Sequence, residues 1–366
     1  MENQFTVENS AFLFKKLIFD LSRFFLCFLI LLGLSIPVIE CGLRVFTEQA
    51  YTPGYLLTHP VRHYALRPNF EGRTYGSRFF INADGVRDDE LQIPIRDQDF
   101  RIAVFGDSIA FGQGVELQQT FPKKLERNLN LNPSDSGERK YRVINLAVPG
   151  YNFVTQVAYL KEVFGHFKPK LLIFTFSLQQ QTITAPDSKL NQVGWARQAK
   201  DYLRTLYSYV YFSSRFYSFR ATSSATSQSI QHSDRSDLNQ ISEYYRDDYP
   251  GWKDCKSALR ELENFCDINH IQLVMAIVGD EGKISPSRES DPLNPIMNKF
   301  EEALGTAGIT HTVFFDDALR AYSNRSSEIK LRDDDNHYSQ LAHQLTGDFL
   351  YQYLERNPSL LQDKVL

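Results

Sequence analysis

The sequence lacks the features that mark several large classes of protein. Its 40 basic and 44 acidic residues nearly cancel to a net charge of −4, so no positive excess indicates a nucleic-acid partner. It has only four cysteines, and their spacing matches no zinc pattern. The sequence contains no spaced histidine and acidic cluster, no phosphate-binding loop and no internal repeat. We therefore expect no metal site, no cofactor and no nucleic-acid partner.

Two of the cysteines share one predicted helix. Cys255 and Cys266 lie eleven positions apart in the sequence. In a helix that separation is about 16 Å along the axis, which is too far for a disulfide bond. We expect two packed thiols.

One long apolar run is present, and it lies near the N-terminus. Residues 24–39 carry no charge, and residues 17–21 extend the apolar character to about the length that spans a bilayer. A cleaved signal peptide is an alternative, although no small-residue cleavage site follows the run. A buried core helix is a second alternative. The length of the run favours an uncleaved transmembrane anchor at residues 16–40.

Charges beside this run predict its orientation. Lys15, Lys16 and Arg23 precede its most apolar part. The positive-inside rule then places the tail, residues 1–15, in the cytoplasm and the bulk of the chain outside it. The sequence thus predicts a single-pass membrane protein whose main domain is extracytoplasmic.

After the anchor, residues 41–98 are an extended lead-in punctuated by proline and glycine turns. From residue 99 to about 358, short apolar strands alternate with amphipathic helices, which predicts parallel βαβ units. The expected strands are Phe100–Phe105, Tyr141–Val148, Lys170–Ser177, Ile271–Gly279 and Thr312–Asp316. The expected helices are Phe121–Leu129, Phe153–Phe167, Trp252–Asn269, Asn294–Leu304, ended by Gly305, and Ser339–Arg356.

An insertion at about residues 185–250 interrupts this alternation. It contains an aromatic segment of helical length, 202–219, and a stretch rich in serine, threonine and glutamine, 221–236. Two interpretations stay open, a surface insertion with an irregular cap and a lid or membrane-facing flap over the active site.

A serine follows the first predicted strand of the domain. Phe105-Gly106-Asp107-Ser108 comes directly after an apolar run and leads into the glycine-rich segment 111–114. A serine on a tight strand-to-helix turn is exposed at the carboxyl end of a sheet, where it can act as a nucleophile. The alternative to a nucleophile is a serine that only caps the following helix. The glycines at 112 and 114 are expected to permit the turn.

A histidine near the C-terminus can serve as the base. Asp334 lies three residues before His337, ahead of a predicted helix. A carboxylate at that spacing can receive the Nδ1 proton, which leaves Nε2 to accept a proton from serine. Asp333 and Asp335 are rivals for this orienting role, and a solvated acidic helix start is the alternative for the whole motif.

Together these segments resemble the SGNH, or GDSL-type, hydrolase family. Residues 104–108 resemble its nucleophile block, residues 144–152 its glycine block, with Gly150, and Asp334-x-x-His337 its terminal block. They occur in the family's order, and residues 82–87 of the lead-in resemble membrane-anchored bacterial members. The resemblance implies a three-layer α/β/α sandwich with a parallel five-stranded, flavodoxin-like sheet, in addition to the N-terminal transmembrane helix.

The resemblance also implies roles. Ser108 is the expected nucleophile, His337 the base and Asp334 its orienter. The expected oxyanion donors are the backbone N–H groups of Ser108 and Gly150 and a side-chain amide from a third block. Here the sequence departs from the family, because Gln179 stands where the family has asparagine and Gln180 replaces the neighbouring acid. Glutamine keeps the amide donor but is one methylene longer.

The expected activity is hydrolysis of carboxylic, O-acyl, esters through an acyl-serine intermediate. Location and family resemblance favour acylated surface glycans or lipids as substrates. Two alternatives stay open. The same triad could transfer the acyl group to a sugar hydroxyl, and the substitutions at Gln179 and Gln180 would also suit a catalytically weakened binding protein on this fold.

Overall fold

The structure, a computed structural model, describes most of the chain. The described residues are 2–46, 50–90, 99–131, 140–178, 194–213, 215, 238, 241–279, 284–333 and 335–364. The chain divides into two compact units, of which the first comprises residues 1–48 and 203–226. The second comprises residues 49–202 and 227–366.

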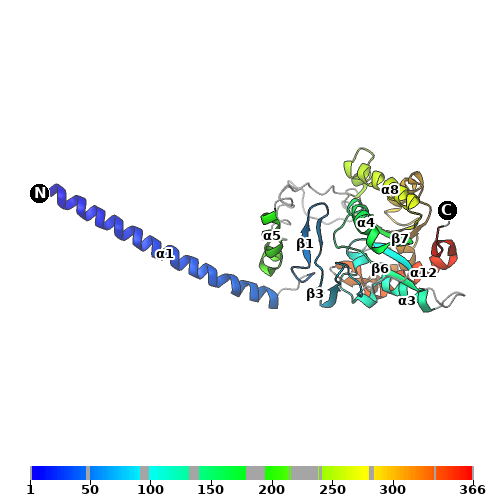
Figure 1. Ribbon diagram of the computed structural model, residues 1–366, viewed down its shortest axis with the longest axis horizontal. Coiled ribbons are helices and arrows are strands. Elements are labelled where there is room, and N and C mark those ends of the chain that lie inside the picture. Colours follow the sequence, from blue (N-terminus) through cyan, green and yellow to red (C-terminus); the bar gives the residue numbers. More distant parts are fainter. Residues whose placement is uncertain are drawn as a thin grey trace. The chain divides into compact units, whose positions relative to one another are not determined.

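A parallel sheet of five strands forms the centre of the second unit (Figure 1). Its spatial order is β6-β5-β7-β8-β9, and every neighbouring pair is parallel. Taking the strands in chain order, this is the 2-1-3-4-5 order of flavodoxin-like folds, which confirms the predicted fold class. The strands are β5 (Phe100–Phe105), β6 (Tyr141–Asn145), β7 (Leu171–Ser177), β8 (Gln272–Val278) and β9 (Thr312–Phe314).

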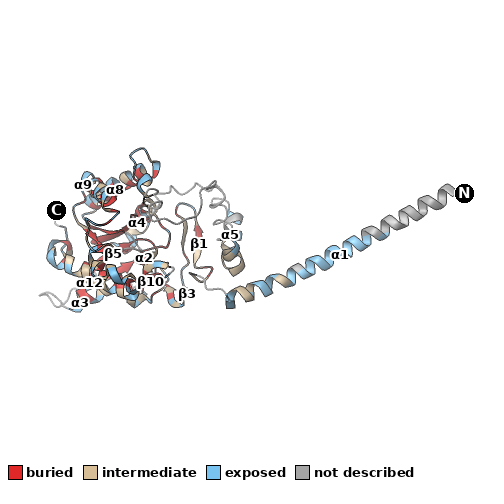
Figure 2. Ribbon diagram, turned by 180° about the vertical axis from the view of Figure 1, so that it is seen from behind, coloured by how far each residue is buried: buried red, intermediate tan, exposed pale blue. Residues whose placement is uncertain are grey.

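Helices cover both faces of this sheet, which explains why its strands are almost continuously apolar. Every residue of β5 and β7 is buried, and the sheet is accordingly red in Figure 2. On one face α3 (Phe121–Leu131) packs against α12 (Gln340–Arg356). On the other, α8 (Pro250–Ile268) contacts both α4 (Phe153–Phe167) and α9 (Asn294–Ala307) (Figure 1).

The helix ends are close to those expected, with one correction. Gly305 does not end α9, which continues to Ala307 and is capped by Gly308. Gly308 has a φ of 89°, the left-handed conformation in which a glycine at this cap carries no steric cost. Other short elements include α2 (Ser108–Phe111), η1 (Leu117–Gln119), α5 (Gly194–Leu203), α10 (Phe315–Leu319), η3 (Arg320–Arg325), α11 (Ser326–Ile329), β10 (Lys330–Arg332), β11 (Asp335–Tyr338) and η4 (Pro358–Leu361).

The lead-in is folded into two antiparallel hairpins. The first joins β1 (Leu56–His59) to β2 (His63–Leu66), and the second joins β3 (Phe70–Thr74) to β4 (Ser77–Ile81). Side chains from both hairpins belong to the same buried cluster as the sheet, among them Leu66, Phe79 and Ile81. The lead-in is therefore part of the domain's core and more than a connection to it.

The first unit contains the long helix α1 (Glu2–Phe46). Its segment Phe19–Phe46 contains an 18-residue window with a mean hydropathy of 2.4 and is long and apolar enough to cross a membrane. None of the apolar window is buried, as the pale blue of this part of α1 in Figure 2 illustrates. The Glu40 carboxylate accepts hydrogen bonds from the backbone N–H groups of Tyr207 and Ser208, at 2.8 and 2.9 Å. It therefore caps the short helix at 207–213.

Both Cys255 and Cys266 are buried, unbonded thiols in α8, as the sequence predicts. Burial raises the pKa of each thiol, so neither is a reactive thiolate at neutral pH. Much of the insertion at 185–250, where a lid was one interpretation, lies outside the described residues.

Candidate active site

Ser108 begins α2, directly beyond the carboxyl end of β5. The strand order reverses around β5, which lies between β6 and β7, and ligands bind at such switch points in open α/β sheets. The cap of α2 is Asp107, whose Oδ1 accepts a hydrogen bond from the N–H of Ile109 at 2.9 Å. Ser108 is thus not the capping residue, and its hydroxyl is available for other contacts.

Gly106 permits the tight turn between β5 and α2. A Cβ at this position would overlap the hydroxyl of Thr175, on β7, and the methyl group of Ala110. Thr175 in turn donates a hydrogen bond to the carbonyl of Phe105 at 3.1 Å. A glycine before Asp107-Ser108 is therefore a steric requirement of this sheet.

His337 reaches Ser108 from the other end of the chain. It lies on β11, which pairs with β10 just before α12. Its Nε2 is 2.7 Å from Oγ of Ser108, within hydrogen-bond distance. The two residues that the sequence selects as nucleophile and base are therefore in contact.

The carboxylate beside His337 belongs to Asp335. Its Oδ1 lies 2.5 Å from Nδ1 of His337 and accepts the backbone N–H of the same residue at 2.9 Å. The expected orienter, Asp334, lies outside the described residues. Residues 335–338 form a strand, where side chains two positions apart share a face, and this places the Asp335 carboxylate beside the His337 ring.

The surroundings of Asp335 keep it ionised. Its side chain is 10% exposed, and burial alone raises its pKa. Hydrogen bonds from the His337 ring, the His337 backbone and the Tyr75 side chain outweigh burial and hold the pKa well below its ordinary value. An ionised Asp335 fixes the proton of His337 on Nδ1, which leaves Nε2 free to accept from Ser108.

Gly150 lies on the loop after β6, next to this turn. Hydrogen bonds from Leu146 N to Val104 O, at 2.8 Å, and from Val148 N to Gly106 O, at 3.1 Å, hold the loop beside β5. Gly150 has a φ of 78°, and a Cβ there would meet the hydroxyl of Tyr64. The other expected oxyanion donor, Gln179, lies outside the described residues, as does Gln180.

A buried arginine from the lead-in fixes the loop after Ser108. Arg87 is fully buried and donates to the carbonyls of Phe111, Gly112 and Val115 at 2.6 to 2.7 Å. Burial lowers the pKa of its guanidinium to about 10, which still leaves it charged at neutral pH. Phe111 is the last residue of α2 and the other two carbonyls follow it, so Arg87 stabilises the end of the helix that begins with Ser108.

Gln113, on the same loop, contacts His337. Its Nε2 lies 3.2 Å from Nδ1, and its Oε1 accepts from the hydroxyl of Tyr51 at 2.6 Å. Nδ1 of His337 carries the proton that is directed at Asp335, so it should face an acceptor and not a second donor. Turning the Gln113 amide by 180° would place its oxygen beside Nδ1, and its nitrogen would then donate to the Tyr51 hydroxyl. No sequence pattern assigns a site role to Gln113, Tyr51 or Tyr75, and Arg87 is marked only as part of the family-like segment 82–87, because each is brought to the site by tertiary packing.

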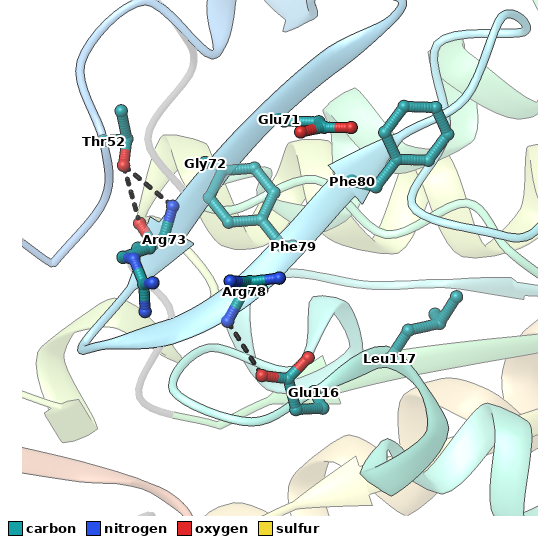
Figure 3. Close-up of a pocket in the computed structure, with 9 residues that line it drawn as sticks. All are labelled: Thr52, Glu71, Gly72, Arg73, Arg78, Phe79, Phe80, Glu116 and Leu117. Carbon is teal, nitrogen blue, oxygen red and sulfur yellow. Dashed lines mark hydrogen bonds between the residues drawn. The ribbon is translucent and has the colours of Figure 1, made fainter.

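A hollow of about 660 Å³ lies on the β3–β4 hairpin, and neither Ser108 nor His337 lines it (Figure 3). Arg78, on its wall, donates its backbone N–H to the Glu116 carboxylate at 3.0 Å. The lining residues are Thr52, Glu71, Gly72, Arg73, Arg78, Phe79, Phe80, Glu116 and Leu117. Across the described ranges, no group of three or more histidine, cysteine, aspartate or glutamate residues could hold a metal ion.

Comparisons with known proteins found matches to this chain only among solved structures. No protein-family model matches it, and no curated protein matches it in sequence. Among solved structures, the lipase/acylhydrolase from Enterococcus faecalis is 13% identical, with 73% of this chain and 100% of that chain covered and a TM-score of 0.38. The esterase EstA from Pseudoalteromonas is 10% identical, with coverages of 71% and 98% and a TM-score of 0.39.

An acetylxylan esterase from Geobacillus stearothermophilus is 13% identical, with coverages of 70% and 93% and a TM-score of 0.34. Similarity at this level carries no argument about activity. The chain's own features are more informative. It has the flavodoxin-like sheet of the SGNH hydrolases, with Gly-Asp-Ser after the first strand, a glycine after the second and a histidine before the last helix.

Proposed function

We propose that the protein is an SGNH-type serine esterase that hydrolyses carboxylic, O-acyl, esters. The observation that carries the proposal is the hydrogen-bonded row of Ser108 Oγ, His337 Nε2 and Nδ1, and Asp335 Oδ1, with distances of 2.7 and 2.5 Å. A nucleophile, a base and an orienting acid in such a row are the parts of a serine hydrolase. The row favours an enzyme over a binding protein on the same fold.

In the proposed reaction Ser108 Oγ attacks the ester carbonyl carbon while its proton passes to His337 Nε2. The C–O bond to the alcohol then breaks, and His337 returns that proton to the departing alkoxide. In the second half, His337 takes a proton from water as the water oxygen attacks the acyl carbon. The bond from that carbon to Ser108 Oγ then breaks, His337 returns the proton to Oγ, and the acid is released. Backbone N–H groups of Ser108 and Gly150, with the Gln179 amide, would stabilise the oxyanion.

The ionised Asp335 contributes by stabilising the imidazolium that forms in each half of the reaction. Because His337 becomes positively charged next to a carboxylate that is only 10% exposed, the charge separation is stabilised with little solvent screening. No metal or cofactor is required for this chemistry.

We also propose that α1 anchors this enzyme in a membrane through Phe19–Phe46, with the tail cytoplasmic and the esterase domain extracytoplasmic. The hydropathy of that segment and the basic residues before it support the proposal. On this view the substrates are acylated glycans or lipids near that membrane. Alkaline extraction should leave the full chain in the membrane fraction, and release into the supernatant would contradict the anchor.

The direct test of the activity uses the full chain in detergent micelles with p-nitrophenyl acetate and longer acyl esters. We expect p-nitrophenol release from the wild type and at least about a 1000-fold lower rate for Ser108→Ala. Ser242→Ala, which alters an exposed helix serine, serves as the matched control. Equal rates for wild type and Ser108→Ala in folded samples would refute the esterase. Acyl transfer to an added sugar in preference to water would indicate the transferase.

A further inference from the structure

The tip of the β3–β4 hairpin contains an unexpected residue. Thr74 pairs with Ser77, so the loop consists only of Tyr75 and Gly76. Both have positive φ, at 44° and 83°, as a type I′ turn requires. Asparagine, aspartate and glycine dominate this turn because they tolerate the left-handed conformation, whereas a tyrosine there is strained. Some interaction must compensate for that strain.

The compensating contacts come from the strand pair that carries His337. The Tyr75 side chain hydrogen-bonds the Asp335 carboxylate. The guanidinium of Arg332 lies over the Tyr75 ring, 5.3 Å from its centre. Arg332 and Asp335 are partners in the β10–β11 ladder. The ring and the hydroxyl of Tyr75 are thus both held by the segment that presents the base.

The same turn is fixed to the loop that follows Ser108. Thr74 Oγ1 accepts the N–H of Gly114 at 3.1 Å, and Ser77 Oγ donates to the Gly114 carbonyl at 2.8 Å. Gly114 has a φ of 81°, and a Cβ there would overlap the side chain of Leu331. The hairpin tip therefore lies against both the nucleophile's loop and the strand pair of the base.

We propose that Tyr75 is a positioning residue that acts through Asp335. Its hydroxyl donates to the carboxylate and fixes the rotation that keeps Oδ1 on Nδ1 of His337. The strain at Tyr75 is retained because asparagine or glycine, which suit the turn better, could not reach the carboxylate. This inference rests on the proposed function, and it makes the lead-in hairpin a part of the catalytic apparatus.

The experiment measures how fast a fluorophosphonate probe labels Ser108 in the full chain in detergent micelles. In this reaction an O–P bond forms at Ser108 Oγ, the P–F bond breaks, fluoride leaves and the serine proton passes to His337. Tyr75→Phe keeps the ring and removes the hydroxyl, and we expect labelling about 5- to 10-fold slower. The control is Tyr353→Phe on α12, which removes a hydroxyl that is hydrogen-bonded to His311. This variant should label at the wild-type rate.

A second variant separates positioning from folding. Tyr75→Asn suits the turn better, so its melting temperature should equal or exceed that of the wild type while its labelling is slower. In an Asp335→Asn background, Tyr75→Phe should slow labelling no further, because its action passes through the carboxylate.

Three results would overturn the inference. Wild-type labelling of Tyr75→Phe would leave the esterase intact and remove the role of Tyr75. The same fold-decrease in the wild-type and Asp335→Asn backgrounds would reduce Tyr75 to a structural residue. No labelling of the wild type above Ser108→Ala would refute the proposed function and this inference with it.

Discussion

One carboxylate oxygen of Asp335 binds both the ring and the main chain of His337. Oδ1 lies 2.5 Å from Nδ1 and 2.9 Å from the backbone nitrogen of that residue. The two contacts fix the imidazole relative to its own strand, so the direction of Nε2 follows from the backbone of β11. A base held in this way needs little reorganisation before it can accept a proton.

This contact predicts which of the neighbouring acids matters. We expect Asp335→Asn to lower kcat by about 10³- to 10⁴-fold with little loss of stability, since the amide would favour the wrong tautomer of His337. Asp334→Asn should lower kcat by less than about tenfold, because Asp335 supplies the carboxylate that contacts Nδ1 of His337. Ester hydrolysis by the two purified variants measures the difference, and the reverse result would return the orienting role to Asp334.

A methyl group at residue 106 should destabilise the domain. Gly106→Ala would overlap Thr175 and Ala110, at a cost of about 1–3 kcal/mol in the free energy of unfolding. The matched control is Gly165→Ala in α4, where a Cβ meets nothing within 4 Å and should add about 0.5–1 kcal/mol. Urea unfolding of both variants compares the two effects, and equal midpoints would contradict the packing argument.

Loss of the Arg87 side chain should weaken the loop behind Ser108. Arg87→Met leaves the carbonyls of Phe111, Gly112 and Val115 without their donors, a loss on the order of 3 kcal/mol. Arg87→Lys should recover only part of this, because an ammonium group lacks the planar fork that reaches three carbonyls. Thermal unfolding measures the order of stabilities, and the exposed Arg246→Met should unfold at about the wild-type temperature.

Acid should destabilise the protein through His343. Burial, with the positive charges of Arg87 and His337, lowers the pKa of His343 to about 3, whereas the unfolded chain titrates near 6.5. The unfolded state therefore binds more protons between those values. As the pH falls from about 6.5 to 3, stability should fall by up to about 1.4 kcal/mol per unit.

His343→Asn tests this dependence, because its side-chain oxygen can still accept the Phe121 N–H that Nδ1 accepts at 3.3 Å. Urea unfolding at a series of pH values should give a flatter acid limb for the variant. Identical slopes for the variant and the wild type would show that His343 does not titrate in this range.

The sheet and its flanking helices could be predicted from the sequence because their signals are local. Runs such as Leu171–Ser177 are mostly apolar and are buried at every position, and α4 begins and ends where its pattern predicts. The contact between Ser108 and His337 followed from the family resemblance. The membrane anchor, the oxyanion donors and the domain bounds stay predictions.

The contact of Asp335 with His337, the role of Tyr75 and the packing of the lead-in hairpins depend on tertiary contacts that no local pattern encodes. Three consecutive acids precede Asn336, and of these Asp335 lies in β11 and contacts the His337 ring. Tyr75 resembles an ordinary hairpin residue until the position of Asp335 is known. Proline and glycine in the lead-in marked its turns but could not indicate that its hairpins would join the core.

The separation of 229 positions between Ser108 and His337 has a consequence for biosynthesis. A ribosome releases the N-terminal lead-in, the nucleophile turn and all five strands of the central sheet before the segment that supplies the base. On the proposed mechanism, a nascent chain that lacks His337 has no base for Ser108, and activity would begin only once β10, β11 and α12 have docked. Under the proposed topology, no active enzyme would exist until nearly the whole chain had crossed the membrane.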